Sequence, residues 1–222
     1  MQFQSQYEIT HREGGTFAGK ELSARFGVGG PLQSWTQVAL VSGSELDNGV
    51  LFNTQSIRFY FEAQPWGGLT FAILAEDGEQ IDYENTRLGD RILFQPKVTW
   101  NINQSLLMDI SSIFASLDTK EGEKIFDASV VDARVTWQFN LRSFLRMTVQ
   151  HAETSRNPDV YIDEVDANSK DVGRQLLYSY KINPQTVFFL GYSDQYVDDD
   201  SLGSLTASDR SLFMKIGYAW SL

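Results

Sequence analysis

The chain alternates polar and apolar residues most strictly in Asp132-Ala133-Arg134-Val135-Thr136-Trp137-Gln138-Phe139-Asn140. In an extended strand, successive side chains point to opposite faces of the sheet. One face of this segment is therefore apolar and the other polar, a pattern that helical periodicity does not fit. The segment predicts a β-strand that lies between an apolar and a polar environment.

The same alternation recurs along most of the chain, which predicts about twelve strands of about ten residues each. In residues 91–102 the even positions from Ile92 to Ile102 are apolar, and only Leu93 breaks the pattern. Residues 57–64, 145–150 and 175–182 repeat it. The fold class predicted is all-β and antiparallel.

The connections between these segments alternate in length. Gly, Pro or Asn mark short turns near residues 29–31, 64–68, 101–105, 140–143 and 183–185. Longer acidic stretches lie between them at residues 76–90, 118–127, 153–172 and 194–209. Short turns at one end and long loops at the other are typical of an up-and-down transmembrane β-barrel, with periplasmic turns and extracellular loops. Residues 1–222 are predicted to form this one domain in the bacterial outer membrane.

Aromatic side chains gather at the strand ends beside the short turns. Amphipathic rings form girdles at the membrane interfaces of such barrels, although aromatic residues also favour strands in general. The predicted girdle consists of Trp66, Trp100, Trp137, Tyr180, Tyr218 and Trp220.

The polar face carries charged side chains that would line the lumen if the apolar face meets lipid. The lumen-facing candidates are Arg25, Arg58, Glu62, Arg91, Lys97, Asp132, Arg134, Arg146, Lys181 and Lys215. Such a lining would favour an anionic solute or bind a sugar through charged hydrogen bonds. The alternative is that these groups pair with one another and fill the lumen.

Composition restricts the function classes. The formal net charge of −11 argues against nucleic acid as a partner, because phosphate contacts need a basic surface. The absence of cysteine excludes disulfides and thiolate chemistry. No run reaches the roughly 20 apolar residues of a spanning helix. The start of the chain lacks signal-peptide features, so we expect it to be the C-terminal portion of a longer protein.

Residues 210–222 alternate and carry aromatics close to the end of the chain. They resemble the C-terminal sorting strand of bacterial outer-membrane proteins, in which Ser221-Leu222 displaces the usual terminal aromatic residue. The resemblance implies recognition by the barrel-assembly machinery. The other partners expected are outer-membrane lipid and lipopolysaccharide.

Two further stretches, Trp137 to Arg146 and Leu176 to Asp194, resemble domain-of-unknown-function family 5916. The second combines an Asn183-Pro184 turn with the strand end Gly191-Tyr192-Ser193-Asp194. Proteins of this family join an N-terminal carbohydrate-binding-like module to a C-terminal membrane barrel. The resemblance covers mainly residues 130–222 and implies a barrel with no established activity, so it assigns no catalytic residue.

Together these patterns favour a channel, uptake component or surface receptor. Two alternatives remain open: a soluble all-β carbohydrate-binding module, and an outer-membrane hydrolase that uses His151 with Ser155 or Asp159. No nucleophile motif supports the hydrolase, so the chain is not expected to be an enzyme. The acidic run at 198–200 lacks the spacing of a calcium loop. No metal or cofactor is expected.

Overall fold

Twelve strands make up the protein in a computed structural model, which describes residues 1–11, 17–183 and 185–218. The strands are β1 (Gln2–His11), β2 (Phe17–Gly30), β3 (Ser34–Asp47), β4 (Val50–Trp66), β5 (Leu69–Asp82), β6 (Arg87–Asn103), β7 (Leu106–Thr119), β8 (Lys124–Asn140), β9 (Ser143–Arg156), β10 (Asn168–Asn183), β11 (Thr186–Asp199) and β12 (Thr206–Tyr218). A 3-10 turn, η1, covers Pro158–Val160. No helix among the described residues is long and apolar enough to cross a membrane.

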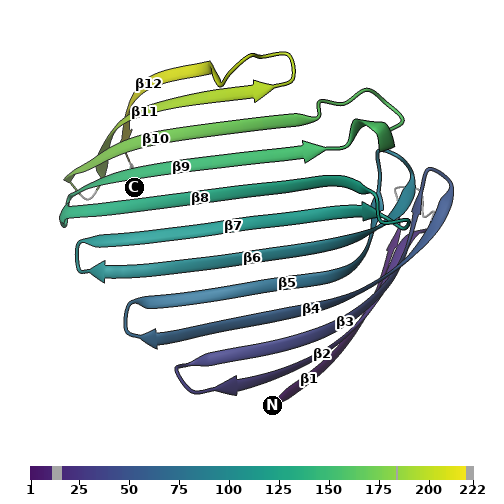
Figure 1. Ribbon diagram of the computed structural model, residues 1–222. Coiled ribbons are helices and arrows are strands. Elements are labelled where there is room, and N and C mark those ends of the chain that lie inside the picture. The colour runs from purple at the N-terminus through teal and green to yellow at the C-terminus, as the bar shows by residue number, and fades with distance from the viewer. Residues whose placement is uncertain (12–16, 184, 219–222) are drawn as a thin grey trace.

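The strands form a single antiparallel sheet in sequence order, each hydrogen-bonded to the next, and the sheet curls from β1 to β12 (Figure 1). The prediction of twelve up-and-down strands is confirmed. A β-sandwich needs two sheets that pack face to face. The one-sheet topology of the described residues therefore excludes the sandwich form of the carbohydrate-binding alternative.

The connections differ from the prediction in length. Two or three residues join the strands at the predicted short turns, but at the other end only residues 83–86, 120–123, 157–167 and 200–205 interrupt the later strands. Most of each stretch predicted as a long loop continues as strand, so strands β2 to β12 have 13–17 residues. At this end β3 and β4 meet in a two-residue turn, Asn48-Gly49, because both residues accept the positive φ of a tight hairpin.

The two faces of the sheet differ in chemistry and exposure. One face carries apolar side chains that no other described residue covers, such as Leu40 (61% exposed), Ile92 (60%) and Met214 (69%). The opposite face holds buried residues such as Ser23, Ala39 and Glu76. Side chains crowd together on the inside of a curve, so the exposures identify the apolar face as convex and the polar face as concave.

The two edge strands are paired on one side only. β1 bonds to β2 and β12 bonds to β11, and the described residues show no hydrogen-bonded pairing between β1 and β12. All ten residues of β1 are exposed. Unpaired edge N–H and C=O groups tend to recruit another strand.

On the concave face, two glycines make room for aromatic rings on the neighbouring strands. A Cβ added to Gly191 would lie 2.2 Å from Cζ of Phe213, and one added to Gly27 would lie 2.2 Å from Cζ2 of Trp35. In both pairs an aromatic side chain covers the backbone of a glycine on the adjacent strand.

This packing predicts that Gly191→Ala lowers the free energy of unfolding by about 1–3 kcal/mol, because the new methyl group must displace the Phe213 ring. Gly173→Ala is the matched control on the adjacent strand, since nothing lies within 4 Å of its added Cβ. A urea titration followed by tryptophan fluorescence compares the two. Equal unfolding midpoints for both variants would show that the Phe213 ring does not occupy this position.

Candidate functional site

The strand register places all ten lumen-facing candidates on the concave face. Arg58 opposes Ala39 and Glu76, and Arg134 opposes Asp109 and Thr148. Following the same alternation from β2 to β12 puts every member of the set on this side: Arg25, Arg58, Glu62, Arg91, Lys97, Asp132, Arg134, Arg146, Lys181 and Lys215. The alternation of side chains along each strand therefore brings together charges from seven strands.

The three adjacent strands β4, β5 and β6 hold a cluster of paired charges on the concave face. Glu76 accepts from Nε of Arg58 at 2.9 Å and lies 3.2 Å from Nη2 of Arg91. Its side chain is only 10% exposed, against 37% for Arg58 and 26% for Arg91. The alternative in which lumen charges pair with one another thus holds for Arg58 and Arg91. Glu76 itself was missed by the sequence analysis because it falls in a stretch predicted to be a loop.

The concave-face cations nearer the turns are not paired in this way. Arg146 donates to Thr136 Oγ1 at 3.3 Å and lies over the ring of Phe144. Six cations lie within six positions of the turn end of their strands, and we call them the basic half: Arg25, Lys97, Arg134, Arg146, Lys181 and Lys215. None of them forms an ion pair with a residue that the structure describes.

Acidic groups are unevenly distributed along the same face. Three inward-facing acids lie level with the basic half. Glu62 accepts from Tyr60 Oη at 2.7 Å, Asp109 accepts from Thr99 Oγ1 at 2.9 Å, and Asp132 is level with Lys97 in the register. Nearer the loops the inward acids include Glu8, Glu21, Asp171 and Asp209. The concave face is therefore basic toward the turns and more acidic toward the loops.

The longest described loop, residues 157–167, is anchored to a distant hairpin. Asn85 Oδ1 accepts from the backbone N of Ile162 at 2.8 Å, and Arg87 donates to the backbone O of Val160 at 2.7 Å. Asp82 holds both anchors, since it accepts from Asn85 at 2.7 Å and from Arg87 at 2.9 Å. The loop is thus tied to the β5–β6 connection rather than extending freely.

Three larger apolar side chains of the loop end of the sheet are almost completely buried. Ile81, Leu117 and Ile125 are at most 3% exposed. Asn157 in the loop donates its backbone N–H to the backbone O of Ile125 at 3.0 Å, which continues the sheet into the loop. Burial raises the pKa of Tyr161, and the nearby Glu84 raises it further. The loop end of the sheet therefore combines buried apolar side chains with a backbone hydrogen bond to the loop.

The acidic run at 198–200 serves local structure. Asp200 accepts from the backbone N–H groups of Ala167 and Asn168, and Asp199 accepts from Ser201. Among the described residues, no group of three or more potential ligands could hold a metal ion.

The predicted girdle residues lie at the turn end of the convex face. Trp66 and Trp100 each oppose Leu69, Trp137 opposes Leu106, Tyr180 opposes Phe188 and Tyr218 opposes Thr186. Trp220 lies outside the described residues. Trp35, by contrast, is on the concave face over Gly27.

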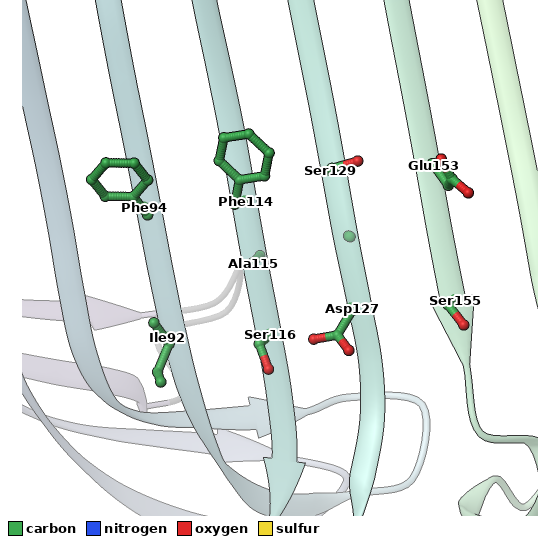
Figure 2. A pocket seen from close by; sticks show the side chains of 10 residues that line it. Ile92, Phe94, Phe114, Ala115, Ser116, Asp127, Ser129, Glu153 and Ser155 are labelled. Carbon is green, nitrogen blue, oxygen red and sulfur yellow. The ribbon is translucent and has the colours of Figure 1, made fainter.

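A shallow groove of about 410 Å³ marks where the convex face changes from apolar to polar (Figure 2). Ile92 and the stacked rings of Phe94 and Phe114 form its apolar side. Asp127 and Glu153 lie on its polar side, each with a lysine partner, Lys124 at 3.2 Å and Lys170 at 3.4 Å. Both carboxylates of the groove are therefore engaged in ion pairs.

The structure does not bring together the residues that the hydrolase alternative requires. His151 faces outward on β9, and its hydrogen-bond partner is Glu153 at 3.4 Å. Ser155 is one of the residues that line the shallow groove, and Asp159 lies in the anchored loop. The three residues are not joined in a hydrogen-bonded triad.

Comparison with known proteins gives a fold likeness only. No protein-family model matches the chain, so the resemblance to family 5916 has no such support, and no curated protein matches its sequence. A solved structure of the NanC porin aligns over 98% of this chain and 98% of that chain, with 13% sequence identity and a TM-score of 0.39.

The paired cluster predicts that Glu76→Gln lowers the free energy of unfolding by about 1–3 kcal/mol, because Arg58 and Arg91 lose their shared counter-charge. Glu21→Gln is the control, as this exposed concave-face carboxylate forms no ion pair with any residue that the structure describes. Urea titration measures both variants. A Glu76→Gln protein as stable as Glu21→Gln would contradict a structural role for the cluster.

Proposed function

We propose that this chain is the membrane-spanning barrel of an outer-membrane channel. The observation that carries the proposal is the separation of faces, with a continuous exposed apolar surface outside and charged side chains inside. Soluble proteins rarely expose apolar patches of this extent. Lipid would cover the convex face, and the turn-end aromatics would lie at the interface.

Spanning a bilayer requires that every backbone polar group be satisfied, so the barrel must have no open edge. β1 and β12 meet this requirement if they pair. The alternation of apolar and polar side chains on the two strands is compatible with such pairing. Phe3 and Tyr7 on β1 face outward, as do Leu212 and Met214 on β12. An even strand number also makes the two edges antiparallel.

The lining supports passage of small anions through the basic half. Unpaired guanidinium and ammonium groups attract anions and offer hydrogen bonds to them. The anchored 157–167 loop stiffens the opposite end. A surface receptor for an anionic ligand is the second candidate, and it differs from a channel in having no ionic conductance.

Barrel closure predicts that a cysteine on β1 can be joined to one on β12 within a single chain. Gln4→Cys is combined in turn with Ser211→Cys, Phe213→Cys, Lys215→Cys and Gly217→Cys, all inward-facing, after refolding into lipid vesicles. The chain has no native cysteine to interfere. One pair should form an intramolecular disulfide, since facing Cα atoms lie within about 7 Å.

The outward-facing Met214→Cys, paired with Gln4→Cys, is the control and should remain reduced. If every inward pair gives only intermolecular dimers or no disulfide, β1 and β12 are not neighbours and the closed twelve-stranded barrel is wrong.

Anion preference predicts that Lys97→Glu combined with Lys215→Glu lowers the anion-to-cation permeability ratio about threefold. Reversing a charge about 8 Å from an ion changes its energy by roughly 1 kcal/mol in water, and salt reduces this. Reversal potentials across planar bilayers measure the ratio. Lys20→Glu on the convex face is the control, and an equal change in both proteins would rule out the basic half as the selectivity element.

A further inference from the structure

A cluster of charged side chains lies on the convex face where β10, β11 and β12 meet. Arg174 on β10, Asp194 on β11 and Arg210 on β12 oppose one another in register. Arg174 holds Asp194 through two hydrogen bonds of 2.8 Å, from Nε and Nη2. Arg210 donates to Tyr196 Oη at 3.2 Å.

Tyr196 ties the two arginines together. Its ring centre lies 4.8 Å from Cζ of Arg174 and 6.0 Å from Cζ of Arg210. Stacking on an aromatic ring restricts a guanidinium without using all of its N–H donors. The cluster therefore presents oriented cations on an otherwise apolar face.

The cluster lies near the loop-side limit of the apolar surface, one outward pair before the charged residues Lys170 and Asp198. Toward the turns, the outward residues of the three strands are apolar or aromatic: Leu176, Tyr178 and Tyr180; Tyr192, Leu190 and Phe188; Leu212, Met214, Ile216 and Tyr218. From Arg210 to Tyr218 the strand rises about 27 Å at roughly 3.4 Å per residue. A tilted strand of this length matches the apolar band of about 25 Å found in membrane barrels.

The charges within the cluster do not cancel. Asp194 is the one carboxylate for two guanidinium groups, and its side chain is 6% exposed with Tyr192 also donating to it at 3.2 Å. Arg174 is 51% exposed, and Arg210 is exposed. Asp198, the next outward acid along β11, opposes Lys170 in register. One positive charge with unused donors thus remains at the surface.

We propose that Arg174 and Arg210 bind a phosphate group of lipid A, the phosphorylated lipid of the outer leaflet. This inference rests on the proposed function, which places the loop side of the convex face in that leaflet. Guanidinium groups match phosphate geometry with paired N–H donors. The apolar side chains below the cluster would contact the acyl chains, while Asp194 holds Arg174 in position.

Binding of bisphosphorylated lipid A to the refolded protein in detergent micelles, measured by native mass spectrometry, tests this proposal. Arg210→Gln should weaken binding about fivefold, the effect of one basic side chain beside an anionic lipid surface. The triple variant Arg174→Gln, Asp194→Asn and Arg210→Gln should weaken it further without leaving Asp194 as an unpaired charge. Lys20→Gln, which removes a convex-face cation near the loop end of β2, should bind as the unchanged protein does.

Lipid A without phosphates and phosphatidylglycerol are the comparison lipids, and both should bind at least about fivefold more weakly to the unchanged protein. Equal binding of either lipid, or equal losses in Lys20→Gln and Arg210→Gln, would overturn the site. Heat-modifiable gel migration of the same samples separates the two proposals. A folded barrel without lipid A discrimination refutes the site alone, whereas failure to fold in micelles refutes the proposed function and the site together.

Discussion

Alternation of side chains across an unbroken hydrogen-bond register is the constraint on which the rest of the structure depends. Each strand sends neighbouring residues to opposite faces, and the register transmits this choice to the next strand. Register shifts occur near strand ends, for example between Ala63 and Trp66 and between Gln195 and Tyr196. Once the residues of one strand are assigned to the convex and concave faces, the register assigns the residues of all twelve strands.

This constraint explains how charges distant in sequence come to share one surface. Arg25 and Lys215 are separated by most of the chain, yet both face the concave side. Whether such charges pair depends on local geometry. Glu76 lies on β5, between β4 and β6, and pairs with Arg58 and Arg91 on those two strands. The basic half, by contrast, has few inward-facing acids nearby. Among the described residues, the concave face therefore carries ion-paired cations at Glu76 and cations without ion pairs nearer the turns.

Much of the fold could be predicted from the sequence, because period-two patterning and turn residues are local signals. The positions of Trp100 and Trp137 beside short turns followed from the same signals. Strand lengths could not be predicted, since segments such as Glu76–Asp82 are acidic and read as loop although the backbone stays paired. The Asn85 anchor was also missed, as its partner Ile162 lies 77 positions away and no local pattern links them. The alternation of side chains along β10 and β12 is also sufficient to place Arg174 and Arg210 on the apolar face.

The central claim is that lipid covers the convex face while water fills the concave side. Met147 and Thr148 are adjacent on β9 and face outward and inward, respectively. A fluorophore attached to Met147→Cys or Thr148→Cys in vesicle-refolded protein reports which solvent each side meets. The account predicts quenching by a lipid-soluble quencher at 147 and by aqueous iodide at 148. Aqueous quenching at both positions, with no effect of the lipid-soluble quencher, would contradict it.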